Sequence, residues 1–287
     1  MNLFDLTGPE FLQFYIVLAA FVAIALAFHR RRYEAGPAPK IEFDPYSIAF
    51  LRGGKNEALR VGVVSLIDRD LLAVKGENVT QTARARSVTA TPLERALLDH
   101  FSSERKATDV FKDSRLDEAC RPLAENLQEH GLLPDDTAKK RRWTATMLAL
   151  LLLLGVSGIK LAVGLQRGKP VIFLLVLTVI AVVVAWRVAN PRVTLKGKAF
   201  LEDLRTLYRG LQDRASSVHS GGATAEALML AAVFGLAALP VASFGYSRSL
   251  FPKAQSSTSG CGSSCGSSCG SSCGGGGCGG GCGGCGG

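Results

Sequence analysis

Charged residues are scarce in this chain of 287 residues: they make up 20% of it, whereas 47% is hydrophobic. A soluble domain usually carries about 25% charged residues, so the deficit indicates a membrane protein. Histidine is rarer still, with four scattered copies, and the sequence contains no H-E-x-x-H motif, no glycine-rich phosphate loop and no G-x-S-x-G motif. We therefore expect neither an enzyme nor a cofactor site.

Three long apolar runs account for the missing charge: residues 11–28, 143–165 and 171–188. A helix needs about 20 apolar residues to cross the hydrocarbon layer, so each run predicts a transmembrane helix. A fourth run, 225–246, is shorter in its apolar part, rich in alanine and interrupted by Pro240. It is either a fourth transmembrane helix or an interfacial or packed helix.

The basic residues predict the orientation of these helices. They cluster after the first run, before the second and after the third, at Arg30, Arg31, Arg32, Lys139, Lys140, Arg141, Arg142, Arg187, Arg192, Lys196 and Lys198. Cytoplasmic loops carry such an excess, so residues 33–142 and 189–224 are predicted to be cytoplasmic and the N-terminus outside, in a bacterial inner membrane. No A-x-A cleavage pattern follows the first run, which favours a retained anchor over a signal peptide.

The loop 33–142 is long enough to fold as a small domain. Helix signals over 46–52 and 57–69 precede a hairpin signal at 71–74 and 79–82, which is the order of a winged-helix-like element. A capping box at Thr91-Pro-Leu-Glu94 begins a second helical unit. The two units end in a similar pattern, at 66–72 and 127–133. They are either a weak internal repeat or two unrelated helical hairpins.

The charge of this loop argues against nucleic-acid binding. Residues 33–138 hold 14 Lys and Arg against 18 Asp and Glu, whereas DNA binding needs a basic surface. A protein partner is therefore expected, besides the lipid bilayer, and no small-molecule substrate is identified.

The predicted fold class is an all-α membrane protein with three to four transmembrane helices, a cytoplasmic, mainly helical, winged-helix-like loop domain and a disordered tail. Its parts are an anchor at 1–32, the cytoplasmic domain at 33–142, a transmembrane hairpin at 143–188, a juxtamembrane amphipathic helix at 189–224, the possible fourth helix at 225–246 and the tail at 247–287. The amphipathic helix is expected to pack on the loop domain or to lie on anionic headgroups.

The tail holds seven of the eight cysteines in a setting of glycine and serine: Cys261, Cys265, Cys269, Cys273, Cys278, Cys282 and Cys285. With almost no apolar residues it cannot bury a core. Thiolates bind soft metals, so these residues are candidate metal ligands, although near-uniform spacing specifies no one set of four. The eighth, Cys120, is predicted to be buried in its helix.

Several stretches together carry a resemblance: His29-Arg-Arg-Arg32, Pro45-Tyr-Ser-Ile-Ala-Phe-Leu-Arg-Gly-Gly54, Val64-Ser-Leu-Ile-Asp-Arg-Asp-Leu-Leu72 and the Gly/Cys-rich tail. They resemble an uncharacterised family of bacterial multi-pass membrane proteins, catalogued as a domain of unknown function with a low-complexity tail. Asp70 stands where that family leads us to expect glycine. The resemblance implies a bacterial inner-membrane protein and supplies no activity and no site residues.

The leading expectation for function is a non-enzymatic integral membrane protein, a scaffold or sensor with a cytoplasmic protein-interaction domain. Two alternatives use the tail instead. One is a membrane-bound thiol or metal-binding protein, and the other is the precursor of a modified Cys-rich peptide.

Overall fold

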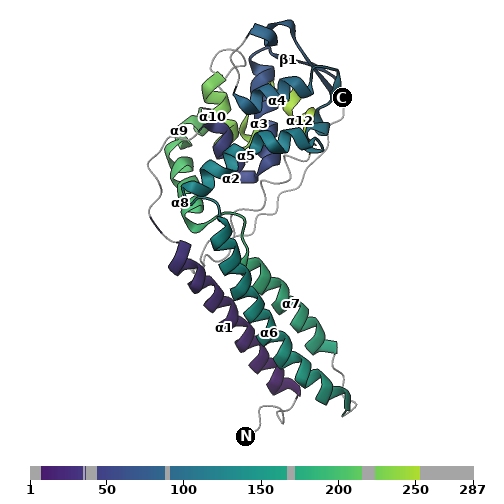
Figure 1. Ribbon diagram of the computed structural model, residues 1–287, viewed down its shortest axis with the longest axis vertical. Coiled ribbons are helices and arrows are strands. Elements are labelled where there is room, and N and C mark those ends of the chain that lie inside the picture. The colour runs from purple at the N-terminus through teal and green to yellow at the C-terminus, as the bar shows by residue number, and fades with distance from the viewer. Residues whose placement is uncertain are drawn as a thin grey trace, which may run out of the picture.

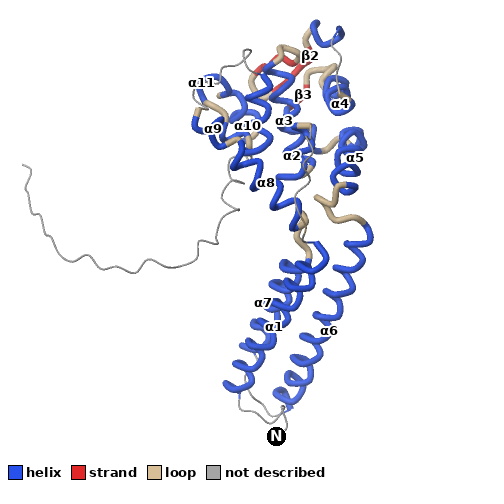
Figure 2. The backbone as a smooth tube through the Cα atoms, turned by 90° about the vertical axis from the view of Figure 1, so that its left-hand side faces the viewer, coloured by secondary structure: helices blue, strands red, loops and turns tan. Residues whose placement is uncertain are grey.

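The computed structural model describes residues 8–34, 36, 44–87, 91–166, 172–214 and 224–252. These form a stalk of three long helices and a mainly helical head at one end of it (Figures 1 and 2). The stalk helices are α1 (Gly8–Glu34), α6 (Asp136–Gln166) and α7 (Ile172–Ala189). All three are long and apolar enough to cross a membrane. The predicted all-α membrane class is confirmed.

The head is built from both sides of the membrane hairpin α6–α7. Before the hairpin it contributes α2 (Pro45–Gly53), α3 (Lys55–Asp68), β1 (Leu72–Lys75), β2 (Asn78–Gln81), α4 (Pro92–His100), β3 (Arg105–Lys106) and α5 (Ser114–Glu129). After it come α8 (Leu195–Leu207), α9 (Arg209–Asp213), α10 (Thr224–Phe234), α11 (Val241–Phe244) and α12 (Tyr246–Leu250). Short 3-10 helices lie at η1 (Ala83–Ser87), η2 (Ala107–Phe111) and η4 (Leu236–Ala238).

One apolar core holds the head together. Leu59 and Leu66 of α3 are fully buried in it, and so are Leu97 of α4 and Leu127 of α5. Residues from after the membrane hairpin, up to Phe251, belong to the same cluster. The chain therefore leaves the head, crosses to the far end of the stalk and back, and returns to complete the core.

The predicted hairpin is present and gains a strand. β1 and β2 pair antiparallel with Leu72 opposite Gln81, and Gly76 turns between them with a φ of 65° that suits glycine. The short β3, which the sequence pattern did not reveal, pairs with β2 through Arg105 and Val79. The order of α2, α3 and hairpin agrees with the winged-helix expectation, but its likeness to that fold stays a prediction.

The two predicted units of the head end in the same way. At the end of α3 the amide of Leu71 donates to the carbonyl of Leu66 over 2.9 Å. At the end of α5 the amide of Leu132 donates to the carbonyl of Leu127, also over 2.9 Å. Both are Schellman motifs, which need a left-handed residue after the helix. Gly131 fills that position in one, and Asp70, with a φ of 56°, fills it in the other. Asp70 is the only non-glycine residue with positive φ among those the structure describes.

A buried carboxylate joins three of the head helices. The predicted capping box is confirmed, since the amide of Thr91 donates to Glu94 and the amide of Glu94 to the Thr91 hydroxyl. The same carboxylate accepts from the Tyr46 hydroxyl over 2.6 Å and from Arg69 over 2.7 Å. Burial, followed by this hydrogen bond, raises the pKa of Tyr46. Because Tyr46 of α2 and Arg69, directly after α3, both bind Glu94 of α4, the capping residue also fixes the packing of these helices.

The possible fourth transmembrane helix at 225–246 is not a span. α10 has 11 residues, which is about 16 Å of helix, half of the hydrocarbon thickness. It ends at Gly235, whose φ is 102°. Leu230 is fully buried in the head core against α2 and α3. The packed alternative is therefore correct, because the apolar face of α10 completes the core of the head and is not exposed to lipid.

Candidate functional site

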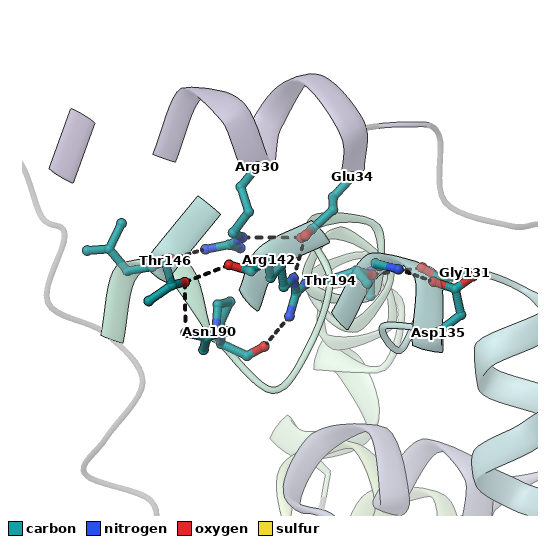
Figure 3. A network of polar contacts seen from close by, with 12 residues as sticks. Arg30, Glu34, Gly131, Asp135, Arg142, Thr146, Asn190 and Thr194 are labelled. Carbon is teal, nitrogen blue, oxygen red and sulfur yellow. Dashed lines mark hydrogen bonds and ion pairs between the residues drawn. The ribbon is translucent and has the colours of Figure 1, made fainter. Parts of the chain in front are cut away.

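The three stalk helices meet the head at a buried ion cluster, which we call the joint: Arg30, Glu34, Arg142, Thr146, Asn190 and Pro191. Arg30 and Glu34 share one face of α1 because they are four residues apart, and Arg30 Nε lies 3.2 Å from a Glu34 carboxylate oxygen. Arg142 of α6 approaches the other oxygen, with Nε at 2.6 Å. Figure 3 shows both guanidinium groups turned toward Glu34. Glu34 and Arg142 are each only 6% exposed.

The same arginines bind the end of α7. Arg142 Nη1 donates to the Pro191 carbonyl over 2.6 Å, and Arg30 Nη1 donates to the Val188 carbonyl over 3.1 Å. The last carbonyls of a helix lack partners within it and attract cations. One carboxylate from α1 and two guanidinium groups thus tie the ends of all three stalk helices.

A second polar contact adds to the joint. The Asn190 side-chain amide donates to the Thr146 hydroxyl over 3.2 Å, and that hydroxyl donates to the Arg142 carbonyl over 2.6 Å (Figure 3). Asp135 caps the start of α6 by accepting from the hydroxyl of Thr137 and the amide of Ala138, and these hydrogen bonds lower the pKa of Asp135. These contacts fix where the stalk helix α6 begins.

On the head side, Thr194 fastens the chain leaving α7 to the end of α5. Its hydroxyl lies 2.8 Å from the Gly131 carbonyl and 2.9 Å from the Leu132 carbonyl, and it accepts from the amide of Gly197 as the N-cap of α8. A Cβ at Gly197 would stand 2.4 Å from the Leu132 carbonyl oxygen. Only glycine allows this close approach, so the start of α8 packs directly against the segment that follows α5.

Arg52 fixes the returning helix α10 to the head. Its guanidinium pairs with Glu57 at 2.5 Å and donates to the Ala232 carbonyl over 2.9 Å at the end of α10. Burial lowers the pKa of Arg52, and Glu57 opposes that change. Nothing in the sequence pattern marks Arg52 as a binder of a helix 180 residues further along the chain.

A His–Asp pair lies elsewhere on the head. His100 Nδ1 lies 2.6 Å from a carboxylate oxygen of Asp113, and this hydrogen bond lowers the pKa of Asp113. From the sequence, His100 is one of four scattered histidines. The hydroxyl or thiol nucleophile that would make this pair catalytic is not among its contacts within the described part of the chain.

The predicted site residues have two outcomes. The seven tail cysteines lie outside the described residues. Cys120 is buried in α5 as predicted, 3% exposed, and burial raises the pKa of its thiol to about 11. Within the described ranges no three or more His, Cys, Asp or Glu side chains gather where they could hold a metal ion.

The comparison with known families bears on this architecture. The profile of the family described as "Predicted membrane protein (DUF2207) C-terminal domain" matches residues 39–220. The chain belongs to this DUF2207 family. The resemblance to an uncharacterised membrane protein family is confirmed, and with it the membrane class. No curated protein and no solved structure matches the chain.

The limits of the DUF2207 match divide the joint. Arg142, Asn190 and Pro191 lie within 39–220, whereas Arg30 and Glu34 of α1 lie before it. α10 and the tail cysteines lie after it. The DUF2207 description names a membrane protein and no activity.

Proposed function

We propose that this protein is a non-enzymatic integral membrane protein of the bacterial inner membrane, a scaffold or sensor that holds a protein-interaction head at a fixed place on the cytoplasmic face. The joint is the observation that carries the proposal. A buried ion pair between Glu34 and Arg142 holds the head ends of α1 and α6 together, and Thr194 fastens the segment after α7 to the end of α5. Such a connection suits a role that depends on where the head is held or on how the helices below it move.

The distribution of basic residues supports a cytoplasmic head. Nine lysines and arginines flank the head end of the stalk, at Arg30, Arg31, Arg32, Lys139, Lys140, Arg141, Arg142, Arg187 and Arg192. The loop that joins α6 to α7 at the other end holds only Arg167 and Lys169. By the positive-inside rule the head end faces the cytoplasm. With three spans, the chain after α7 stays on that side, which places the tail thiols in a reducing compartment.

The alternative function uses those thiols to bind a soft metal or to exchange disulfides. Its support is the repeat Cys-Gly-Ser-Ser from Cys261 to Cys273. Metal analysis of the purified full chain separates the two. Zinc or copper that co-purifies with the wild type but not with a Cys-to-Ser tail favours the tail function.

The topology is tested first with a membrane-impermeant maleimide on intact cells, after a reductant has opened any disulfides. We expect Cys285 to react only after lysis. Reaction before lysis would place the tail outside and contradict the cytoplasmic head.

The interaction role is tested by a photo-crosslinking residue placed at one exposed head position at a time: Glu77 on the hairpin, Arg121 on α5 and Leu207 on α8. The control position is Leu151, 73% exposed on the stalk and lipid-facing. We expect a discrete protein adduct from one head face in living cells, and none from Leu151. Failure of all three head positions to give an adduct contradicts a protein-interaction head.

A further inference from the structure

A pocket of about 600 Å³ lies beside the joint, between the start of α6 and the segment that follows α7. Its walls include Lys139, Lys140, Arg142 and Trp143 from α6, with Asn190 and Pro191 opposite. Neither the family nor the proposed role accounts for a cavity here. Its position, charge and aromatic wall indicate what it binds.

Two tryptophans set the depth of the pocket in the membrane. Trp143 of α6 packs edge to face on Trp186 of α7, with ring centroids 5.8 Å apart. Tryptophan is enriched at the level of the lipid headgroups. The apolar part of α6 starts at the same residue, so the pocket opens at the boundary between headgroups and hydrocarbon.

The pocket is positively charged. Arg142 is largely neutralised by Glu34, and its Nη2 is buried without a hydrogen-bond partner among the described residues. Lys139 has a single ion pair, with Asp136 at 2.9 Å, and both side chains are more than half exposed, so water weakens it. Lys140 forms no ion pair or hydrogen bond with any residue in the described ranges. At least one lysine charge therefore remains for a ligand.

We propose that this pocket binds the phosphodiester headgroup of an anionic phospholipid, held by Lys139 and Lys140, with the acyl chains lying along α6 and α7. Basic pockets between transmembrane helices on the cytoplasmic side are suited to such headgroups. The apolar stalk surface directly below supplies the place for the chains, which a soluble anion does not need. Leu148 and Leu151 of that surface are each 73% exposed.

The two tryptophans make the test direct, because they are the only ones in the chain, Trp143 lines the pocket and Trp186 packs on Trp143. The full chain is reconstituted in phosphatidylcholine bilayers with a small, constant fraction of brominated lipid, which quenches indole fluorescence on contact. We expect brominated phosphatidylglycerol to quench more than brominated phosphatidylcholine, with an enrichment of about fivefold per lysine. Equal quenching by the two lipids overturns the proposal.

A matched pair of variants separates a site from general attraction. Lys139→Gln/Lys140→Gln removes the pocket lysines and should abolish the preference. Arg31→Gln/Arg32→Gln removes the same charge from exposed positions on α1 that do not line the pocket, and should keep it. If both variants lose the preference for phosphatidylglycerol equally, the lipid is attracted only by surface charge, and the proposed binding site is overturned. Lys139→Arg/Lys140→Arg should keep the preference, and unchanged quenching of the Gln variant by brominated phosphatidylcholine shows that it did not fail through misfolding.

A last arm distinguishes a lipid from free phosphate. Inorganic phosphate is added to bilayers that contain brominated phosphatidylglycerol, with sodium chloride at the same ionic strength as control. We expect no relief of quenching beyond that of the salt. Specific relief by phosphate would assign the pocket to a soluble anion instead. The result depends on the three spans but not on the scaffold or sensor role, so either can fail without the other.

Discussion

The stalk and the head differ in what many of their large apolar side chains face. In the stalk, alanines such as Ala181 and Ala185 are buried between helices together with Tyr15 and Leu153, but Leu151 and Phe173 are more than 70% exposed. In the head, large side chains such as Leu66 and Phe101 are fully buried. Lipid solvates leucine as well as a protein interior does, so small residues that let helices approach belong at membrane interfaces. Water solvates large apolar side chains poorly, so the head buries them.

The joint belongs to neither pattern. Glu34 and Arg142 are buried as deeply as core residues but are charged. A buried charge is tolerated only when it is paired. Four predictions sharpen the contrast between the two regions and the joint, beginning with the largest expected effect.

Removing the central carboxylate should have the largest effect. Glu34→Ala leaves Arg30 and Arg142 buried without their shared partner, so the free energy of unfolding should fall by about 3–5 kcal/mol. The measurement is denaturant-induced unfolding of the full chain in detergent. The control is Glu125→Ala, which removes an exposed ion pair with Arg121 and should cost at most about 1 kcal/mol.

A compensating pair tests the reason for that loss. Glu34→Gln/Arg142→Met removes the buried pair and should recover part of the stability that Glu34→Ala loses, because Arg142 is no longer a buried charge without a partner and only Arg30 still lacks its carboxylate. If Glu34→Ala costs no more than Glu125→Ala, the joint does not hold the stalk helices together as described.

Truncating equal leucines in the two regions should give unequal results. Leu66→Ala opens a cavity in the head core and should cost about 2–5 kcal/mol. Leu151→Ala removes a side chain that faces lipid, 73% exposed, and should cost less than about 0.5 kcal/mol. Thermal unfolding of both variants in bilayer nanodiscs measures the difference. Equal losses would mean that the stalk surface is packed and not lipid-facing.

The head should become less stable at high pH because Cys120 is buried. Burial raises the pKa of its thiol from 9.0 to about 11. Below pH 9 the thiol is protonated in both the folded and the unfolded chain. Between pH 9 and 11 only the unfolded chain loses the proton, so the free energy of unfolding falls by up to about 2 kcal/mol by pH 11.

The comparison is wild type against Cys120→Ala at each pH, because Tyr46 and Tyr246, whose pKa values burial also raises, remain in both. The difference in free energy of unfolding should shrink as the pH rises from 9 to 11. A constant difference would show that the thiol is not shielded from water.

The smallest effect should come from the left-handed residue after α3. Asp70 adopts a φ of 56°, which costs energy for any residue with a Cβ. Asp70→Gly should therefore raise the free energy of unfolding. The gain should be at most about 1 kcal/mol, because glycine also increases the conformational entropy of the unfolded chain. Gly131→Ala at the matching end of α5 should lower it. Destabilisation by Asp70→Gly would mean that the Asp70 side chain contributes more than its strain costs.

Local features of the fold were predictable because they depend on neighbours in the sequence. The capping box at Thr91 and the end of α5 at Gly131 are each set by a few consecutive residues. The hairpin between β1 and β2 was also predictable, from its turn and β-prone flanks. β3 was missed because two residues carry no periodicity of their own and acquire a strand conformation only by pairing with β2.

The residues of the joint are visible in the sequence only as parts of basic clusters. Arg142 is one of four consecutive basic residues, and no local pattern distinguishes it from Lys139 or Lys140. The structure selects Arg142 because its position on α6 faces Glu34, 108 residues earlier in the chain. The pocket arises for the same reason, since α6 and the end of α7 are separate in sequence.

The sequence by itself determined the three membrane helices, their basic flanks and the ends of the head helices, since hydrophobicity, charge and capping act over one or two turns. Tertiary structure alone decided that α10 completes the head core and that a single carboxylate gathers two arginines. Both depend on which surfaces meet. An apolar face is buried by whatever partner excludes water from it, and a charge is stable inside only where an opposite charge is brought to it.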